Sequence, residues 1–238
     1  MDEKNTYATV VVGDDFSPGV IALASSLELS GVSKQLVVLH SELSTINLSR
    51  IGSLDIVSLI PIADLPEPMV ALPSVISTEK SIKAMAKMHC WQLAAYDKVV
   101  YLDADTCVYR NTDHMFDFPE LTACPGQPLF NSGVMVLQPS KRTFQRLMAE
   151  VTENAEQWDI PRHYFRGSAH DQMLLAGVFA DRFNIIGREY NATNGKHKTV
   201  LAGSIIVRHW NGPRKPWQDG GGDPMWYKFW PSAMEFKV

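Results

Sequence analysis

Two aspartates separated by one residue follow an apolar stretch of strand length near the middle of the chain. Residues 98–105 read Lys-Val-Val-Tyr-Leu-Asp-Ala-Asp, so Asp103 and Asp105 stand where a strand would end. Ligands of open α/β sheets bind at the carboxyl ends of strands. Two hard oxygen ligands there suit Mg²⁺ or Mn²⁺ bridging a diphosphate. The other interpretation is that both aspartates cap the following turn, and a lone Asp-x-Asp motif leaves both open.

Alternating strands and helices are predicted ahead of this acidic pair. Residues 7–12 form a β-branched run, and a turn then leads into a helix that Ser17 and Pro18 can open. Short apolar runs at 35–39 and 56–60 lie on either side of a helical stretch. The resulting order β-α-β-α-β predicts a parallel, doubly wound sheet.

Two amphipathic helices are predicted, one on each side of the acidic pair. The first starts at Glu79 and leads into the strand that ends at Asp103, with apolar residues at helical spacing. These apolar residues are Ile82, Met85, Ala86, His89, Leu93 and Tyr96. Lys87 lies off this stripe, which disfavours a place in the core. After a strand-like run at 131–137, Ser140 opens the second helix, with a predicted buried stripe of Phe144, Leu147, Met148 and Val151.

The last third of the chain places more polar residues at the ends of predicted elements. A helix is expected to begin near Ser168, with Asp171 and Gln172 in its first turns. The positive end of the helix dipole favours a carboxylate there. A β-like run at 205–207 delivers His209 at its end.

The composition favours a single α/β domain. The chain has 238 residues, 45% of them hydrophobic, which is enough for one large core. The formal net charge is −4 and the charges are interspersed, so nucleic acid is not an expected partner. The three cysteines form no Cys-x-x-Cys pair, which favours a reducing compartment. There is no apolar signal stretch after Met1 and no run near ~20 apolar residues, so we expect a cytoplasmic protein without a membrane span.

Several ordered blocks of the sequence resemble the glycogenin-like family of retaining glycosyltransferases, known as glycosyltransferase family 8. They are Ala-Thr-Val-Val-Val-Gly-Asp-Asp-Phe at 8–16, Lys-Met-His-Cys-Trp at 87–91, Tyr-Leu-Asp-Ala-Asp-Thr at 101–106, Phe-Asn-Ser-Gly-Val-Met-Val-Leu-Gln-Pro-Ser at 130–140, His-Asp-Gln at 170–172 and His-Trp-Asn-Gly-Pro-Arg-Lys-Pro-Trp at 209–217. The resemblance implies the single-domain GT-A fold, an α/β architecture with a Rossmann-like, mostly parallel sheet flanked by helices. It also implies one catalytic domain over 1–238, comprising a nucleotide-binding half at 1–105, a donor-sugar and acceptor half at 106–217 and a tail at 218–238.

The resemblance further implies a metal-dependent site for a UDP-sugar. Family members hold Mn²⁺ with the two aspartates of Asp-x-Asp and a downstream histidine, which here are Asp103, Asp105 and His209. Mixed carboxylate and imidazole ligation suits Mn²⁺ better than Mg²⁺, which prefers oxygen ligands. Mn²⁺ is therefore the expected cofactor, with Mg²⁺ as the alternative.

The same resemblance assigns donor-binding and catalytic residues. Those assigned to uridine and ribose are Val10, Val12, Gly13, Phe16 and Ala104, with Phe16 stacking on the base. Those assigned to the sugar and the diphosphate are Lys87, Asn131, Ser132, Gly133 and Gly212. Those assigned to catalysis are Asp171 and Gln172, beside the anomeric carbon, and Lys215, which neutralises the leaving diphosphate.

Departures from the glycogenin pattern leave the donor sugar and the acceptor open. No tyrosine lies within 191–199 to receive glucose, Ser168 stands where glycogenin has an acidic residue, and 122–130 offers no acidic residue either. Losing such partners relaxes the preference for a hydroxylated sugar, so glucose, galactose, xylose and a deoxyhexose all remain open. We therefore expect a separate saccharide acceptor and no self-glucosylation. Trp210 and the aromatics after Asp223 are expected to wall an open cleft for it as exposed platforms; the other interpretation is that these tryptophans belong to the core.

The sequence leaves more than one interpretation of the mechanism, the class of function and the oligomeric state. Retention of configuration can proceed through a covalent intermediate or through same-face attack, and the sequence does not choose. A non-catalytic module that binds nucleotide sugars is the second interpretation of the chain. A haloacid-dehalogenase-like phosphatase is the third, although Cys107 stands where that motif has Thr or Val. The oligomeric state is open, with a homodimer among the options.

Overall fold

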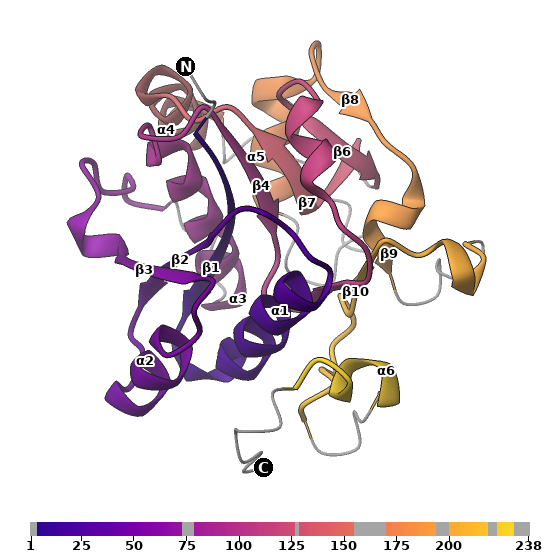
Figure 1. The fold of residues 1–238 in the computed structure, drawn as a ribbon. Coiled ribbons are helices and arrows are strands. Elements are labelled where there is room, and N and C mark those ends of the chain that lie inside the picture. The colour runs from indigo at the N-terminus through magenta and orange to yellow at the C-terminus, as the bar shows by residue number, and fades with distance from the viewer. Residues whose placement is uncertain are drawn as a thin grey trace.

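A seven-stranded sheet runs through the centre of the computed structural model, which describes residues 4–72, 79–126, 129–154, 170–193, 200–218 and 223–230 (Figure 1). The strand order is β3-β2-β1-β4-β7-β6-β8. The strands are β1 (Asn5–Val12), β2 (Leu36–Ser41), β3 (Val57–Pro61), β4 (Lys98–Leu102), β6 (Thr122–Pro125), β7 (Phe130–Leu137) and β8 (Asn184–Ile185).

The sheet is mostly parallel, as predicted. β1 pairs in parallel with β2 and with β4, and β2 pairs in parallel with β3. β7 is the exception, because it runs antiparallel to both of its neighbours, β4 and β6. At the end of β4, the N–H of Asp103 donates to the carbonyl of Gly133 on β7 at 2.8 Å. The reversed strand therefore holds the start of the acidic turn in place.

Helices cover both faces of the sheet, which gives the α/β architecture expected from the sequence. One face packs against α1 (Ser17–Leu29) and α2 (Thr45–Gly52). The other packs against α4 (Lys141–Asn154) and α5 (His170–Phe179). Because successive strand residues point to opposite faces, Tyr7 of β1 joins the first core and Ala8 joins the second. The predicted stripe of α4 is confirmed, since Phe144, Leu147, Met148 and Val151 are all buried.

The segment predicted as one long helix from Glu79 is divided in two. α3 (Glu79–Met85) ends after seven residues, and a 3₁₀ helix continues over Ala86–Gln92. The predicted stripe is buried at Met85, Ala86, His89 and Leu93, but the 3₁₀ segment, with about three residues per turn, buries almost all of its other residues as well. Ile82, predicted to be in the core, is 48% exposed, whereas Lys87, predicted to lie outside it, is only 5% exposed.

A smaller sheet and the C-terminal region lie beside the main sheet. β10 (Val207–His209) pairs with β5 (Thr106–Val108) and with β9 (Ala192–Thr193). In Figure 1 the region around α6 (Pro224–Tyr227) lies below β10.

Trp210, Trp217 and Trp226 are buried, so for these residues the prediction of exposed platforms for a saccharide is wrong and the core interpretation holds. Trp210 is 3% exposed and Trp226 is 1% exposed. They pack in one cluster with Trp217, and the indole N–H of Trp210 donates to the Asp223 carboxylate at 2.7 Å. These rings therefore attach the C-terminal region to the domain.

The cysteines agree with the sequence in the part of the chain that the structure describes. Cys90, Cys107 and Cys124 are all free and buried, as expected for a chain without a disulfide framework. Within the described part of the chain, we find no helix with both the length and the apolar character needed to cross a membrane.

Candidate active site

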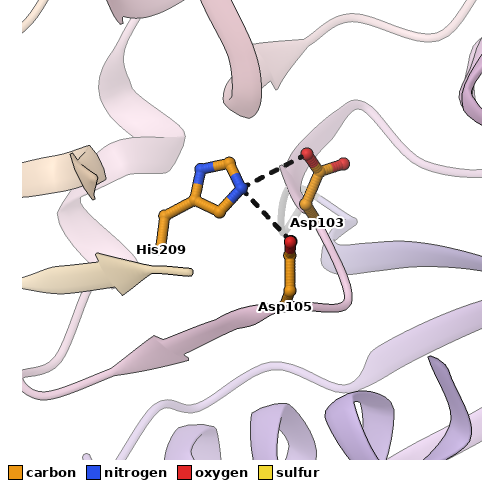
Figure 2. Close-up of side chains that lie close together, drawn as sticks. All are labelled: Asp103, Asp105 and His209. Carbon is orange, nitrogen blue, oxygen red and sulfur yellow. Dashed lines mark ion pairs between the residues drawn. The ribbon is translucent and has the colours of Figure 1, made fainter. Parts of the chain in front are cut away.

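The two aspartates and His209 meet at the carboxyl end of β4 (Figure 2). β10 runs antiparallel to β5 with His209 opposite Thr106, and this register brings the imidazole next to the acidic turn. The Nε2 atom of His209 lies 3.2 Å from Oδ1 of Asp105 and 3.7 Å from Oδ2 of Asp103. One ligand atom from each of the three residues falls within 4.8 Å of the others. The trio predicted as metal ligands is therefore close enough to share one ion.

A chain of amide hydrogen bonds fixes which imidazole nitrogen faces the aspartates. The backbone N–H of Gly133 donates to Oδ1 of Asn131 at 3.0 Å, so that oxygen is an acceptor. Nδ2 of Asn191 also donates to it, at 2.7 Å, which leaves Oδ1 of Asn191 to accept from Nδ1 of His209 at 2.8 Å. With a proton on Nδ1, the ring turns Nε2 toward the acidic pair, where its lone pair can bind a metal. Outer partners of this kind orient metal-binding histidines.

Gly133 lies against the His209 ring. A Cβ added to Gly133 would stand 2.3 Å from Cε1 of His209, far inside van der Waals contact. The absence of a side chain therefore makes room for the imidazole. The sequence assigned Gly133 to the donor sugar, but the described cavity is lined by its neighbour Ser132 and not by Gly133 itself.

Lys215 binds the second aspartate. Its Nζ lies 2.6 Å from Oδ2 of Asp105 and donates to the carbonyl of Trp210 at 2.9 Å. Burial alone would raise the pKa of Asp105, but the contact with His209 and the charge of Lys215 hold that pKa well below its ordinary value. Asp105 is therefore an anion at neutral pH, with one oxygen toward the lysine and the other toward the imidazole.

Lys87 links the first aspartate to Asp171 on α5. Its Nζ lies 3.1 Å from Oδ1 of Asp103 and 2.8 Å from Oδ2 of Asp171. Ser132 also donates to Oδ2 of Asp171 at 2.6 Å, and the hydroxyl of Tyr101 donates to Asp103 at 2.7 Å. Burial alone would lower the pKa of Lys87, but the two carboxylates raise it above its ordinary value. The buried lysine is therefore a fixed cation between two anions.

A cavity of about 430 Å³ opens over these groups. Most of the residues that the sequence assigned to the site line it; they are Val10, Val12, Phe16, Lys87, Asp103, Ala104, Asp105, Asn131, Ser132, Asp171, Gln172, His209 and Lys215. Gly13, Gly133 and Gly212 are not among the lining residues. Gly13 instead turns the chain after β1 with a φ of 74°, and its N–H donates to the carbonyl of Ser41.

Sequence reasoning missed several residues of the site. The cavity is also lined by Val11, Asp15, Glu79, Lys80, Lys83, Ala84, Tyr101 and Asn211. Asn191 was missed as the partner of His209, although it begins the stretch inspected for an acceptor tyrosine. Tyr101 was within reach of sequence reasoning, since residues i and i+2 of a strand share one face and Tyr101 stands two places before Asp103.

The mostly parallel sheet flanked by helices has the GT-A glycosyltransferase fold, as superposition on solved structures shows. The structure of the galactosyltransferase LgtC, in complex with donor and acceptor sugar analogs, superposes with a TM-score of 0.67 at 18% sequence identity. The match covers 94% of this chain and 93% of LgtC. The fold predicted from the sequence is therefore confirmed.

Sequence comparison then gives the family. A sequence model of glycosyl transferase family 8 matches residues 120–221. Glycogenin of Neurospora crassa is 30% identical over 229 residues, which cover 91% of this chain and 32% of that protein. UDP-glucuronate:xylan alpha-glucuronosyltransferase 2 of Arabidopsis thaliana is 32% identical over 155 residues, covering 63% of this chain and 25% of that protein. The chain belongs to glycosyltransferase family 8 and is glycogenin-like, and it spans about a third or less of the length of these two relatives.

Proposed function

We propose that the chain transfers a monosaccharide from a UDP-sugar to a separate saccharide acceptor, with Mn²⁺ as cofactor and with retention of configuration. The observation that carries the proposal is the convergence of Asp103, Asp105 and His209, with the Nε2 lone pair of His209 facing both carboxylates. The family assignment favours this function over the phosphatase alternative. The proposal treats 1–105 as the nucleotide-binding half and 106–217 as the half that binds the donor sugar and the acceptor.

The residues at the metal site fit the proposed cofactor. Asp103 and Asp105 offer hard carboxylate oxygens, and His209 offers an imidazole nitrogen. Two oxygens and one nitrogen suit Mn²⁺ better than Mg²⁺. When bound, a divalent cation neutralises the diphosphate and favours its departure.

Lys215 supplies a second positive charge from the protein itself. The side chain is only 8% exposed and is held by Asp105 and the Trp210 carbonyl. A fixed cation in a site shielded from water stabilises charge that grows on a leaving group more strongly than a mobile one. In the proposed reaction, Lys215 therefore stabilises the negative charge on the departing UDP.

Asp171 and its neighbours act on the sugar side of the proposed reaction. Asp171 is 3% exposed, and Lys87 and Ser132 both contact its Oδ2. Nδ2 of Asn131 donates to Oε1 of Gln172 at 3.3 Å, which links the next residue of α5 to β7. A carboxylate held in this way stabilises the positive charge that develops at the anomeric carbon as the bond to UDP breaks. Gln172 supplies a second polar group beside it.

The acceptor is proposed to be a saccharide that is not part of this chain. Glycogenin-like transfer to a tyrosine would require one near 191–199, where the sequence has none. Residues 194–199 and Ser168 lie outside the described part of the chain, so this part of the proposal rests on sequence. The names of the relatives include a galactosyltransferase and a glucuronosyltransferase, so family membership leaves the donor sugar open.

Released UDP tests the proposed function. The purified protein is incubated with a panel of UDP-sugars and Mn²⁺, without and then with oligosaccharide acceptors. We expect slow donor hydrolysis with one sugar, faster UDP release with an acceptor, and loss of both after chelation. Binding of UDP-sugars without any release of UDP would instead favour the non-catalytic module. A ladder of hexose masses on the intact protein after incubation with UDP-glucose would contradict the separate acceptor.

A further inference from the structure

Lys83 lines the cavity away from the metal ligands, at the end formed by the turn after β1. A Cβ added to Gly13 would lie 3.4 Å from Nζ of Lys83, so the ammonium lies over that turn. Lys83 stands four positions before Lys87, about one turn earlier along the same segment. The two lysines therefore serve different parts of the cavity, with Lys87 at Asp103 and Lys83 at Gly13.

The walls of this end of the cavity suit a flat heterocycle. Val10, Val12 and Ala84 supply apolar surface of the cavity, and Phe16 supplies an aromatic ring whose centroid lies 5.4 Å from Nζ of Lys215. The charged groups that could hold a diphosphate and a sugar gather at the carboxyl end of β4 and the start of α5. A nucleoside diphosphate whose phosphates lie at the metal ligands would therefore place its base between these apolar walls, beside Lys83.

Lys83 has one ion-pair partner among the described residues and keeps donors available. Its Nζ pairs with Glu79 at 2.8 Å, and its side chain is 28% exposed. The hydrogen bond to Glu79 raises the pKa of Lys83, with smaller contributions from Asp15 and Glu42, so the amine is protonated at neutral pH. An ammonium group carries three N–H donors. Among the described residues Glu79 is the partner within ion-pair distance, which leaves two donors for a ligand.

We propose that Lys83 selects the base of the nucleotide by donating a hydrogen bond to the C4 carbonyl of uracil, since cytosine shares the C2 carbonyl. This inference rests on the proposed function, because it assumes a nucleoside diphosphate donor. Uracil presents a carbonyl oxygen at the position where cytosine presents an amino group. A lysine ammonium pairs with the carbonyl, but it faces the amino group with donor against donor and cannot bond to it. Such a site discriminates against the wrong base because the polar group of the protein is then left without a hydrogen-bond partner.

The ratio of UDP affinity to CDP affinity tests this role. Calorimetric titrations with Mn²⁺ compare the wild type, Lys83→Met and the control Lys141→Met, which removes an exposed lysine that pairs with Glu67 at 3.2 Å. We expect the wild type and the control to prefer UDP. We expect Lys83→Met to lose roughly ten- to hundredfold in UDP affinity with CDP affinity unchanged, as for one hydrogen bond to a charged group.

Three other outcomes would overturn the assignment. An unchanged ratio in Lys83→Met would mean that the lysine does not read the base. Equal losses for UDP and CDP would mean that it acts on the phosphates or on the fold. If the wild type bound neither nucleotide, the proposed function itself would fail together with this inference, whereas the first two outcomes leave the proposed function intact.

Discussion

The Nδ1 atom of His209 donates a hydrogen bond to Oδ1 of Asn191 at 2.8 Å, and this bond sets the orientation of the imidazole toward Asp103 and Asp105. The two residues are 18 positions apart and lie beside neighbouring strands, since β9 and β10 pair in parallel. The proposed metal site therefore depends on a residue that is not one of its three candidate ligands.

Replacing Asn191 with alanine is expected to lower Mn²⁺ affinity by roughly 10- to 100-fold, as for other outer partners of metal ligands. The reason is that His209 loses the acceptor that keeps its proton on Nδ1. Calorimetric titration of Mn²⁺ measures the effect. Asn154→Ala, which removes an asparagine paired with Glu150 at the end of α4, is the control and should bind Mn²⁺ as the wild type does. Wild-type Mn²⁺ affinity in Asn191→Ala would contradict this positioning role.

Replacing Gly133 with alanine is expected to displace His209, because the new Cβ would stand 2.3 Å from the ring. Overpacking of this kind costs about 1–3 kcal/mol of stability. Chemical denaturation and Mn²⁺ titration should therefore both show a loss. Gly203→Ala is the matched control, since a Cβ at Gly203 would have nothing within 4 Å. Unchanged Mn²⁺ binding in Gly133→Ala would show that the ring can move without loss of the site.

Binding and chemistry are expected to separate at Asp171 and Lys215. Asp171→Asn and Gln172→Ala should keep UDP affinity near wild type but lose turnover by roughly 10²- to 10³-fold, because both residues act on the sugar. Lys215→Met should lose both UDP affinity and turnover, because its charge acts on the diphosphate. Steady-state kinetics with UDP titrations provide the measurement. Normal turnover in Asp171→Asn would show that Asp171 does not act at the anomeric carbon.

Protonation of His89 is expected to destabilise the fold in mild acid. Burial lowers the pKa of His89 from 6.5 to about 4, so between these values the unfolded chain binds more protons than the folded one. The free energy of unfolding therefore rises with pH across that window, by at most on the order of 3 kcal/mol. Urea denaturation from pH 7 down to pH 4 measures the slope. His89→Gln, which stays neutral, should show a shallower slope, and an identical slope would exclude His89 as the source.

Much of the fold follows from local patterns in the sequence. The β-branched run of β1 and the proline in the first turn of α1 are strong local signals, and both elements form where they were predicted. The segment after Met85 was predicted as α-helix but is a 3₁₀ helix, and Lys87 within it is buried because it pairs with Asp103 and Asp171. A pattern of apolar spacing contains no information about that buried ion pair.

Residues of the candidate site could be predicted where their residue type and position in the sequence indicate a chemical role. They could not be predicted where the role depends on contacts made only in the folded chain. Acidic residues at a strand end and the ordered blocks led to Asp103, Asp105 and His209, which the fold brings together. No sequence motif points to Asn191, because its role depends on hydrogen bonds to Asn131 and His209, which lie at the ends of two other strands. Trp210 was misjudged for a similar reason, since the tertiary packing around Asp223 buries it.

The affinity of UDP with and without Mn²⁺ tests the central claim most directly. Metal-free wild type, His209→Ala and the control His114→Ala, a histidine paired with Tyr190 outside the cavity, are titrated with UDP by calorimetry in chelator and then in Mn²⁺. We predict that Mn²⁺ strengthens UDP binding by roughly tenfold or more, about 1.4 kcal/mol, in the wild type and the control. We predict no such gain in His209→Ala, with its circular dichroism spectrum unchanged. Equal UDP affinity in chelator and in Mn²⁺ for the wild type, or a full gain in His209→Ala, would contradict the three-residue metal site.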